Sequence, residues 1–179
     1  MSLPRIIIYM SAVAALCLSP CAAFARAKVA LPPDAPGTAP LTVDCIVGAA
    51  NAANLPLAAL IGILATENGR VGEALLNDNG TWDIGPFQLN TIHVNELAEM
   101  GIAPEDVLRD GCANAYAAAW LLRKEYDRTG DIWQAVGAYH SRTPHRRDAY
   151  IARVKAHLKQ LGKAGLLSLP PFVAGEGGQ

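Results

Sequence analysis

The sequence predicts a mainly α-helical domain that carries one small β-ribbon. Five stretches between residues 45 and 161 repeat apolar residues at intervals of three and four, which is the period of a helix with one buried face. Residues 77–83 break this pattern with the turn sequence N-D-N-G, in which Asn-Gly is a strong hairpin signal. The chain of 179 residues is long enough for one domain with a sizeable core.

Residues 1–25 have the form of a secretory signal peptide. Arg5 supplies a positive charge, an apolar run covers residues 6–18, and Ala23-Phe24-Ala25 fits a cleavage site. The run is too short for a membrane span, and no later segment reaches spanning length. We therefore expect a soluble periplasmic protein with no membrane segment after cleavage; a retained N-terminal anchor is the alternative.

Segments rich in proline and glycine bound the folded domain, which we expect at residues 42–163. Residues 26–41 contain repeated prolines and small residues, and are expected to form an extended leader. Residues 164–179 end in G-E-G-G-Q, which is typical of a flexible tail.

The cysteine pattern favours one disulfide. Cys17 and Cys21 leave with the signal peptide, so Cys45 and Cys112 remain as an even pair in an oxidising compartment. Two buried free thiols are the alternative. Neither cysteine belongs to a C-x-x-C pair or has a histidine at ligand spacing, so we expect no metal site.

The charge balance argues against a nucleic-acid partner. The chain has 15 basic and 16 acidic residues, a formal net charge of −1 at pH 7. Proteins that bind nucleic acid usually show clustered basic charge instead. The four histidines form no H-E-x-x-H pattern, and nothing in the sequence indicates a cofactor.

The first two helices follow from the position of one proline. A stripe over residues 45–53 ends before Leu55-Pro56, because the residue before a proline avoids helical geometry. Pro56 itself suits the first turn of a second helix. The apolar stripe of that helix is Leu57, Leu60, Ile61 and Leu64.

Three more helices are expected downstream. Asp110 can cap the third helix. The stripe expected on it consists of Cys112, Tyr116, Ala119 and Arg123. Stripes over residues 132–139 and 150–161 predict the fourth and fifth helices, and shorter helical turns are expected at residues 91–100 and 104–109.

Glu67 is the first candidate for a catalytic role. It continues the buried stripe one turn beyond Leu64, just before Asn68-Gly69 ends the helix. Burial disfavours the charged carboxylate and raises its pKa, and a carboxyl group that keeps its proton near neutral pH can act as a general acid. The alternative is a structural glutamate that pairs with Arg70.

Asp83 is the second candidate. It lies beside Trp82 in a polar turn region, where backbone donors could keep it ionised. Two carboxyl groups held in opposite protonation states are typical of enzymes that cleave glycosidic bonds. The alternative is an aspartate that only forms the turn.

Three segments together resemble the lysozyme-like lytic transglycosylases. They are A-T-E-N-G at residues 65–69, N-D-N-G-T-W-D-I-G-P-F-Q-L-N at residues 77–90 and A-V-G-A-Y-H-S-R-T-P at residues 135–144. In that superfamily a Glu ends a buried helix, a G-x-x-Q-[ILV]-N segment follows, and a Tyr lies on a later helix. The resemblance covers residue 42 to about residue 161 and implies an α+β lysozyme-like fold, with the β-ribbon beside the active-site cleft.

A narrower resemblance comes from the cysteine neighbourhoods. Asp44-Cys45 and the segment D-G-C-A-N-A-Y-A-A-A-W at residues 110–120 are similar to the small transglycosylases that accompany type III, type IV and conjugal secretion systems. A component of such an apparatus is therefore an expected partner.

The resemblance implies roles for individual residues. Glu67 would be the catalytic acid and base, Gln88 and Asn90 would line the glycan cleft, and Tyr139 would reach toward the acid to orient it or the sugar. Asp83 matches the second carboxylate of the hen-type lysozyme motif S-T-D-Y-G-x-x-Q-I-N.

Two further residues are assigned to substrate binding. Asn68 stands where the family commonly has Ser, and its amide can donate to a carboxylate. Trp82 could stack on a sugar ring. Arg142, Arg146 and Arg147 form a small basic group near the implied cleft; it either meets stem-peptide carboxylates or is a solvated face.

The implied reaction cuts the β-1,4 bond between MurNAc and GlcNAc in peptidoglycan. Glu67 would protonate the bridging oxygen and then, as a carboxylate, take a proton from the MurNAc 6-hydroxyl, which gives a 1,6-anhydro end. Two alternatives stay open: a muramidase that uses Glu67 and Asp83 with water, and a weakly active peptidoglycan-binding assembly protein.

Overall fold

The structure is a computed structural model that describes residues 27–31 and 35–166. The expected signal peptide and all but the first residues of the expected tail lie outside the described residues. Within the described part of the chain, no helix is long and apolar enough to cross a membrane.

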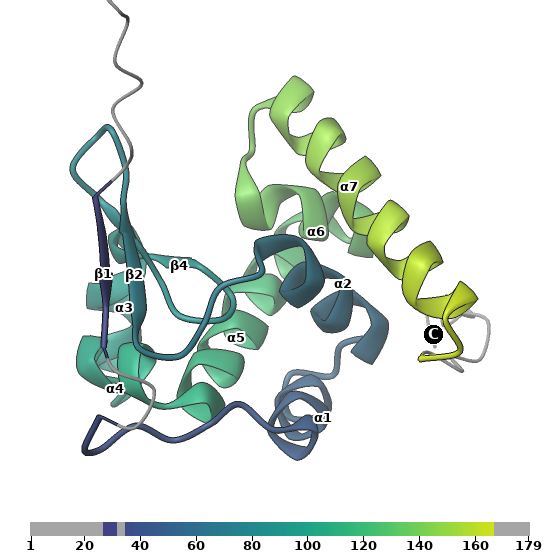
Figure 1. The fold of residues 1–179 in the computed structure, drawn as a ribbon. Coiled ribbons are helices and arrows are strands. Elements are labelled where there is room, and N and C mark those ends of the chain that lie inside the picture. Colours follow the sequence, from purple (N-terminus) through teal and green to yellow (C-terminus); the bar gives the residue numbers. More distant parts are fainter. Residues whose placement is uncertain (1–26, 32–34, 167–179) are drawn as a thin grey trace, which may run out of the picture.

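Helices make up most of the described domain, and a small sheet lies at one side (Figure 1). The helices are α1 (Val43–Ala52), α2 (Leu57–Glu67), α3 (Val94–Glu99), α4 (Pro104–Arg109), α5 (Gly111–Thr129), α6 (Ile132–His140) and α7 (Pro144–Lys163), with the 3-10 turn η1 (Thr91–His93) before α3. The strands are β1 (Lys28–Ala30), β2 (Glu73–Leu76), β3 (Trp82–Ile84) and β4 (Leu89–Asn90). The prediction of a mainly helical, lysozyme-like α+β fold is confirmed.

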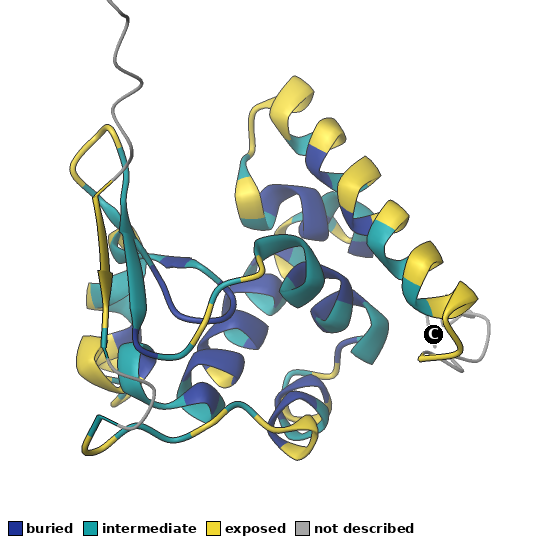
Figure 2. Ribbon diagram, in the orientation of Figure 1, coloured by how far each residue is buried: buried dark blue, intermediate teal, exposed yellow. Residues whose placement is uncertain are grey.

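Helix α5 is the centre of the core. It packs against α1, α4 and α6, and α7 covers α2 and α6. Figure 2 shows α5 as buried or intermediate along most of its length, whereas the outer face of α7 is exposed. The expected α5 stripe is partly wrong, because Tyr116 is 43% exposed while Ala118, Leu121 and Leu122 are buried. Alanine fills several faces of this helix, so its sequence carries little information about which face is buried.

The sheet is antiparallel in the order β1-β2-β3-β4. The expected ribbon is present as β2 and β3, which pair with Leu75 opposite Asp83. The turn between them is closed by the Asn77 N–H, which donates to the Thr81 carbonyl at 2.7 Å.

Part of the expected leader belongs to this sheet. Strand β1 pairs with β2, and Lys28 forms a 2.8 Å ion pair with Glu73. Farther along, the Ala39 N–H donates to the Arg109 carbonyl at 2.8 Å. A three-residue strand is too short to produce a periodic signal, so the sequence did not reveal it.

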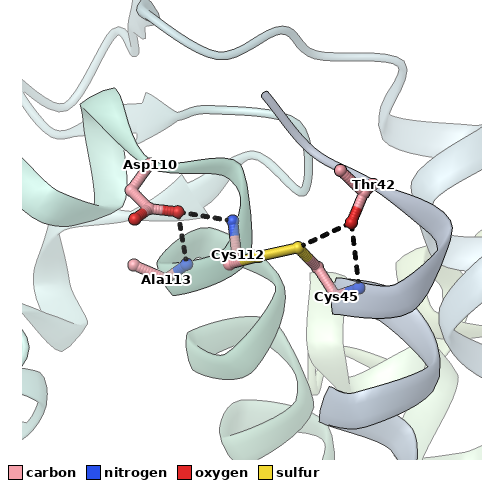
Figure 3. Close-up of a disulfide and its surroundings, with 5 residues drawn as sticks. All are labelled: Thr42, Cys45, Asp110, Cys112 and Ala113. Atoms are coloured by element: carbon pink, nitrogen blue, oxygen red, sulfur yellow. Dashed lines mark hydrogen bonds between the residues drawn. A yellow bond between two sulfur atoms is a disulfide. The ribbon is translucent and has the colours of Figure 1, made fainter. Parts of the chain in front are cut away.

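The disulfide joins the first turns of α1 and α5 (Figure 3). Cys45 and Cys112 have Cα atoms 4.9 Å apart and are separated by 67 positions, and a loop of this length corresponds to about 4 kcal/mol of stabilisation through the unfolded state. The Thr42 hydroxyl accepts from the Cys45 N–H, and the Asp110 carboxylate accepts from the Cys112 and Ala113 N–H groups. Both the predicted pairing and the predicted Asp110 cap are confirmed.

Candidate active site

A cleft of about 850 Å³ separates the sheet from the helices α6 and α7. The end of α2 forms its floor, together with α5. Its lining residues are Thr66, Glu67, Leu75, Asn77, Asp78, Asn79, Thr81, Asp83, Gln88, Asn90, Ile92, His93, Leu121, Tyr139, His140, Ser141, Arg146 and Arg153. Both carboxyl groups predicted from the sequence are among them.

Glu67 is the last residue of α2 and is partly buried in the cleft. Its Oε1 accepts a 2.6 Å hydrogen bond from the Tyr150 hydroxyl. Burial raises the pKa of Glu67 to about 7; the nearby charge of Asp83 also raises it, whereas the Tyr150 hydrogen bond and Arg153 oppose the shift. This agrees with the pKa shift predicted from the stripe. The alternative partner Arg70 is exposed and lines a second cavity instead.

Asp83 lies in strand β3 and not in a turn. The register of the sheet places it opposite Asn90, whose side-chain amide donates to Asp83 Oδ1 at 2.8 Å and to Thr81 Oγ1 at 2.9 Å. The donor is thus a side chain on the neighbouring strand, and not the backbone donors expected from the sequence. Asn90 lines the cleft as predicted and also holds Asp83 in place.

Gln88 reaches the cleft through a tight contact between two segments. Its backbone φ is +49°, and its amide donates to the Gly85 carbonyl at 2.8 Å. A Cβ atom at Gly69 would lie 2.1 Å from the Gly85 carbonyl oxygen and 2.5 Å from Gln88 Nε2. Glycine at position 69 is therefore required for the end of α2 to approach the G-P-F-Q turn.

Tyr139 lines the cleft as predicted, but its hydroxyl does not donate to Glu67. Its hydroxyl donates to the Phe87 carbonyl at 2.9 Å and thereby anchors the G-P-F-Q turn. Tyr150 on α7 makes the contact with Glu67 instead. Burial raises the pKa of the Tyr150 phenol far above its usual value, so the phenol stays protonated and donates.

The sequence contained one weak signal for Tyr150. It falls on the apolar stripe of the fifth helix and is fully buried, as that stripe predicted. A buried tyrosine usually needs a hydrogen-bond partner for its hydroxyl. Nothing in the local pattern identified Glu67 as that partner, because 83 positions separate the two residues.

Asn68 and Trp82 do not line the cleft, in contrast to the prediction. Asn68 is exposed and ends α2 in the left-handed conformation with φ 50°. Trp82 lies between Thr81 and Asp83, but successive side chains of a strand point to opposite faces. Thr81 and Asp83 line the cleft, whereas Trp82 packs against the core.

His140 and Arg153 complete the surroundings of Tyr150. The His140 ring stacks on the Tyr150 ring with centroids 4.7 Å apart and planes at 5°. The Arg153 guanidinium lies 5.3 Å from the same ring centroid. Burial, aided by Arg153, lowers the pKa of His140, which keeps the imidazole neutral at pH 7. Across residues 27–31 and 35–166, no group of three or more His, Cys, Asp or Glu side chains is placed to hold a metal ion.

Replacing Tyr150 with Phe is expected to raise the pKa of Glu67 above about 7. The hydrogen bond stabilises the carboxylate form and so lowers the pKa, whereas burial raises it; without the hydrogen bond the effect of burial is larger. Loss of a hydrogen bond to a charged group changes the pKa by about one unit. A ¹³C NMR titration of the glutamate carboxyl groups measures the shift, with Glu67→Gln identifying the signal. Tyr139→Phe is the matched control, because its hydroxyl contacts Phe87, and it should move this pKa much less. An unchanged or lower pKa in Tyr150→Phe would contradict the prediction.

Comparison with known proteins agrees with this geometry. Residues 44–160 match the family described as "Transglycosylase SLT domain". The chain is 34% identical over 105 residues to "Protein IpgF" of Shigella flexneri, which covers 58% of this chain and 69% of that protein. It is 36% identical over 91 residues to "X polypeptide" of Escherichia coli (48% and 54%), and 32% identical over 108 residues to "Invasion protein IagB" of Salmonella typhimurium (58% and 66%). The chain therefore belongs to the transglycosylase SLT domain family.

Proposed function

We propose that this protein is a lytic transglycosylase that cuts the β-1,4 bond between MurNAc and GlcNAc in peptidoglycan. Membership of the SLT family implies a transglycosylase activity on peptidoglycan. The observation that carries the finer assignment is Glu67, a cleft carboxyl group whose pKa of about 7 leaves it part protonated and part ionised at neutral pH. Such a group can both donate and accept a proton.

Glu67 acts first as the acid. Tyr150 donates to Oε1, which leaves Oε2 to carry the proton that passes to the bridging oxygen as the bond to MurNAc C1 breaks. The positive charge that develops at C1 is stabilised by the MurNAc N-acetyl group. Asp83 lines the same cleft and adds negative charge to it.

Glu67 then acts as the base. As a carboxylate it accepts the proton of the MurNAc 6-hydroxyl, whose oxygen bonds to C1 and closes the 1,6-anhydro ring. The Tyr150 hydroxyl and the charge of Arg153 stabilise the carboxylate between the two steps. Proton transfer by one positioned group contributes about 10²–10⁴ in rate.

The muramidase is the second candidate, because Asp83 faces the cleft beside Glu67. The two reactions differ in their products and in their need for Asp83. Digestion of purified sacculi, followed by mass spectrometry of the muropeptides, should give anhydro ends for the transglycosylase. Asp83→Asn should then slow release only several-fold, since the N-acetyl group does the stabilising. Reducing ends, with a loss on the order of 10²-fold in Asp83→Asn, would establish the muramidase instead.

The setting we propose is the periplasm, where the enzyme makes local openings for a secretion, conjugation or pilus apparatus. Support comes from the form of residues 1–25 and from similarity to a protein named as an invasion protein. Fractionation of cells that express the chain with a C-terminal tag tests the location. Recovery in the cytoplasm at full length would contradict it.

A further inference from the structure

Two of the four arginines near the cleft, Arg142 and Arg147, are paired with carboxylates. Arg142 donates to Glu125 Oε1 at 2.6 Å, and Glu125 is only 3% exposed. Arg147 donates to Asp148 at 2.8 Å. These two members of the basic group seen in the sequence therefore have structural partners and do not line the cleft.

Arg146 and Arg153 differ from them in both respects. They lie seven positions apart on α7 and flank Tyr150, so all three share one face of the helix. Both line the cleft. Among the described residues, no ion pair joins either arginine to a carboxylate. Their charges therefore face the space where a substrate would lie.

The two walls of the cleft carry opposite charges. Asp83 lines the wall formed by the sheet, and Arg146 and Arg153 line the wall formed by α7. An anionic group on a bound glycan strand is repelled by the first wall and attracted by the second. Arginine also matches the planar geometry of a carboxylate, because its guanidinium can donate two parallel hydrogen bonds.

We propose that Arg146 and Arg153 form a subsite for a carboxylate on the lactyl arm of MurNAc. This inference rests on the proposed function, because peptidoglycan is the assumed ligand. The carboxylate is either that of the lactyl group or one of those in the stem peptide attached to it. GlcNAc carries no such group, so the subsite distinguishes the two sugars of the strand. It thereby sets the register of the strand in the cleft and determines which β-1,4 bond lies at Glu67.

The test is a binding experiment with three preparations of glycan strands. One preparation carries stem peptides, one has been stripped to the free lactyl carboxylate, and one has that carboxylate converted to a neutral methylamide. Glu67→Gln serves as the parent for every variant, so that strands are bound and not consumed. The binding variant adds Arg146→Gln and Arg153→Gln to this parent.

The double substitution should weaken binding of carboxylate-bearing strands by about 20-fold, since a charge-assisted contact at a partly exposed site is worth roughly fivefold. Binding of the neutral strands should not change. The preparation that shows the loss identifies which carboxylate is bound. Lys159→Gln with Lys163→Gln is the matched control, because it removes two positive charges from α7 outside the cleft lining, and it should bind like the parent.

Three results would overturn the subsite: equal binding of all three preparations by the parent, no binding of any preparation, or an equal loss for neutral strands in the double variant. The proposed function has a separate readout. It fails if the unsubstituted chain releases no muropeptides from sacculi, whatever the binding preference.

Discussion

Replacing Glu67 with Gln is expected to reduce the release of muropeptides from sacculi by about 10²–10⁴-fold. Glutamine has nearly the same shape and can still accept the hydrogen bond from Tyr150, but it cannot transfer a proton. Mass spectrometry and a turbidity assay on purified sacculi measure the loss. Glu105→Gln is the matched control, since Glu105 is exposed on α4 and lies outside the cleft lining, and it should retain full activity.

A stability measurement separates lost chemistry from lost folding. Glu67 has a folded pKa of about 7 against an ordinary value of 4.5, so the folded state binds the proton more tightly than the unfolded state does. The free energy of unfolding therefore falls as pH rises from about 4.5 to 7. Glutamine does not titrate, so the Glu67→Gln variant does not lose this stability as pH rises. Above pH 7 it should be more stable than the parent by about 2–3 kcal/mol. A folded variant with more than a tenth of the parent's activity would rule out Glu67 as the acid.

Replacing Asn114 with Leu is expected to lower the free energy of unfolding by about 4 kcal/mol. The Asn114 side chain is fully buried on α5. Its oxygen accepts from the Phe87 N–H at 3.0 Å, and its amide donates to the Ile84 and Val107 carbonyls at 3.1 and 3.0 Å. Leucine keeps the volume but leaves three backbone groups without their partner, each worth about 1–3 kcal/mol.

Urea unfolding, followed by circular dichroism, measures this loss. Asn95→Leu is the control, because Asn95 is exposed on α3, and such surface changes usually stay within about 0.5 kcal/mol. A loss below about 1 kcal/mol in Asn114→Leu would mean that water or a backbone shift satisfies the three groups. Activity should fall as well, because Asn114 positions Ile84, which precedes the G-P-F-Q turn, and Phe87, which lies in that turn next to Gln88.

The same contact explains a glycine in the G-P-F-Q turn. Gly85 has φ +70°, and a Cβ atom there would lie 2.3 Å from Asn114 Nδ2. The buried amide and the glycine therefore depend on each other. In the sequence, Asn114 lies in an alanine-rich helix, and no local pattern indicated its three hydrogen bonds.

Local patterns were sufficient for much of the fold and for one candidate catalytic residue. Apolar periodicity located the main helices, Asn-Gly located the ribbon turn, and the even pair Cys45 and Cys112 indicated the disulfide. Glu67 could be identified because the evidence for it lies within one helix. The apolar stripe of that helix determines that the carboxyl group is buried, and burial determines the direction of the pKa shift.

Only the tertiary structure decided which side chains meet. Whether Tyr139 or Tyr150 reaches Glu67 depends on how α6 and α7 pack against α2, and both tyrosines fit their own stripes equally well. Tertiary packing also decided which face of the sheet Trp82 occupies and how β1 pairs. It likewise decided which arginines form structural ion pairs and which line the cleft. Periodicity reports which side of an element is buried, but the partner of a buried group comes from another element, often more than 50 positions away in the chain.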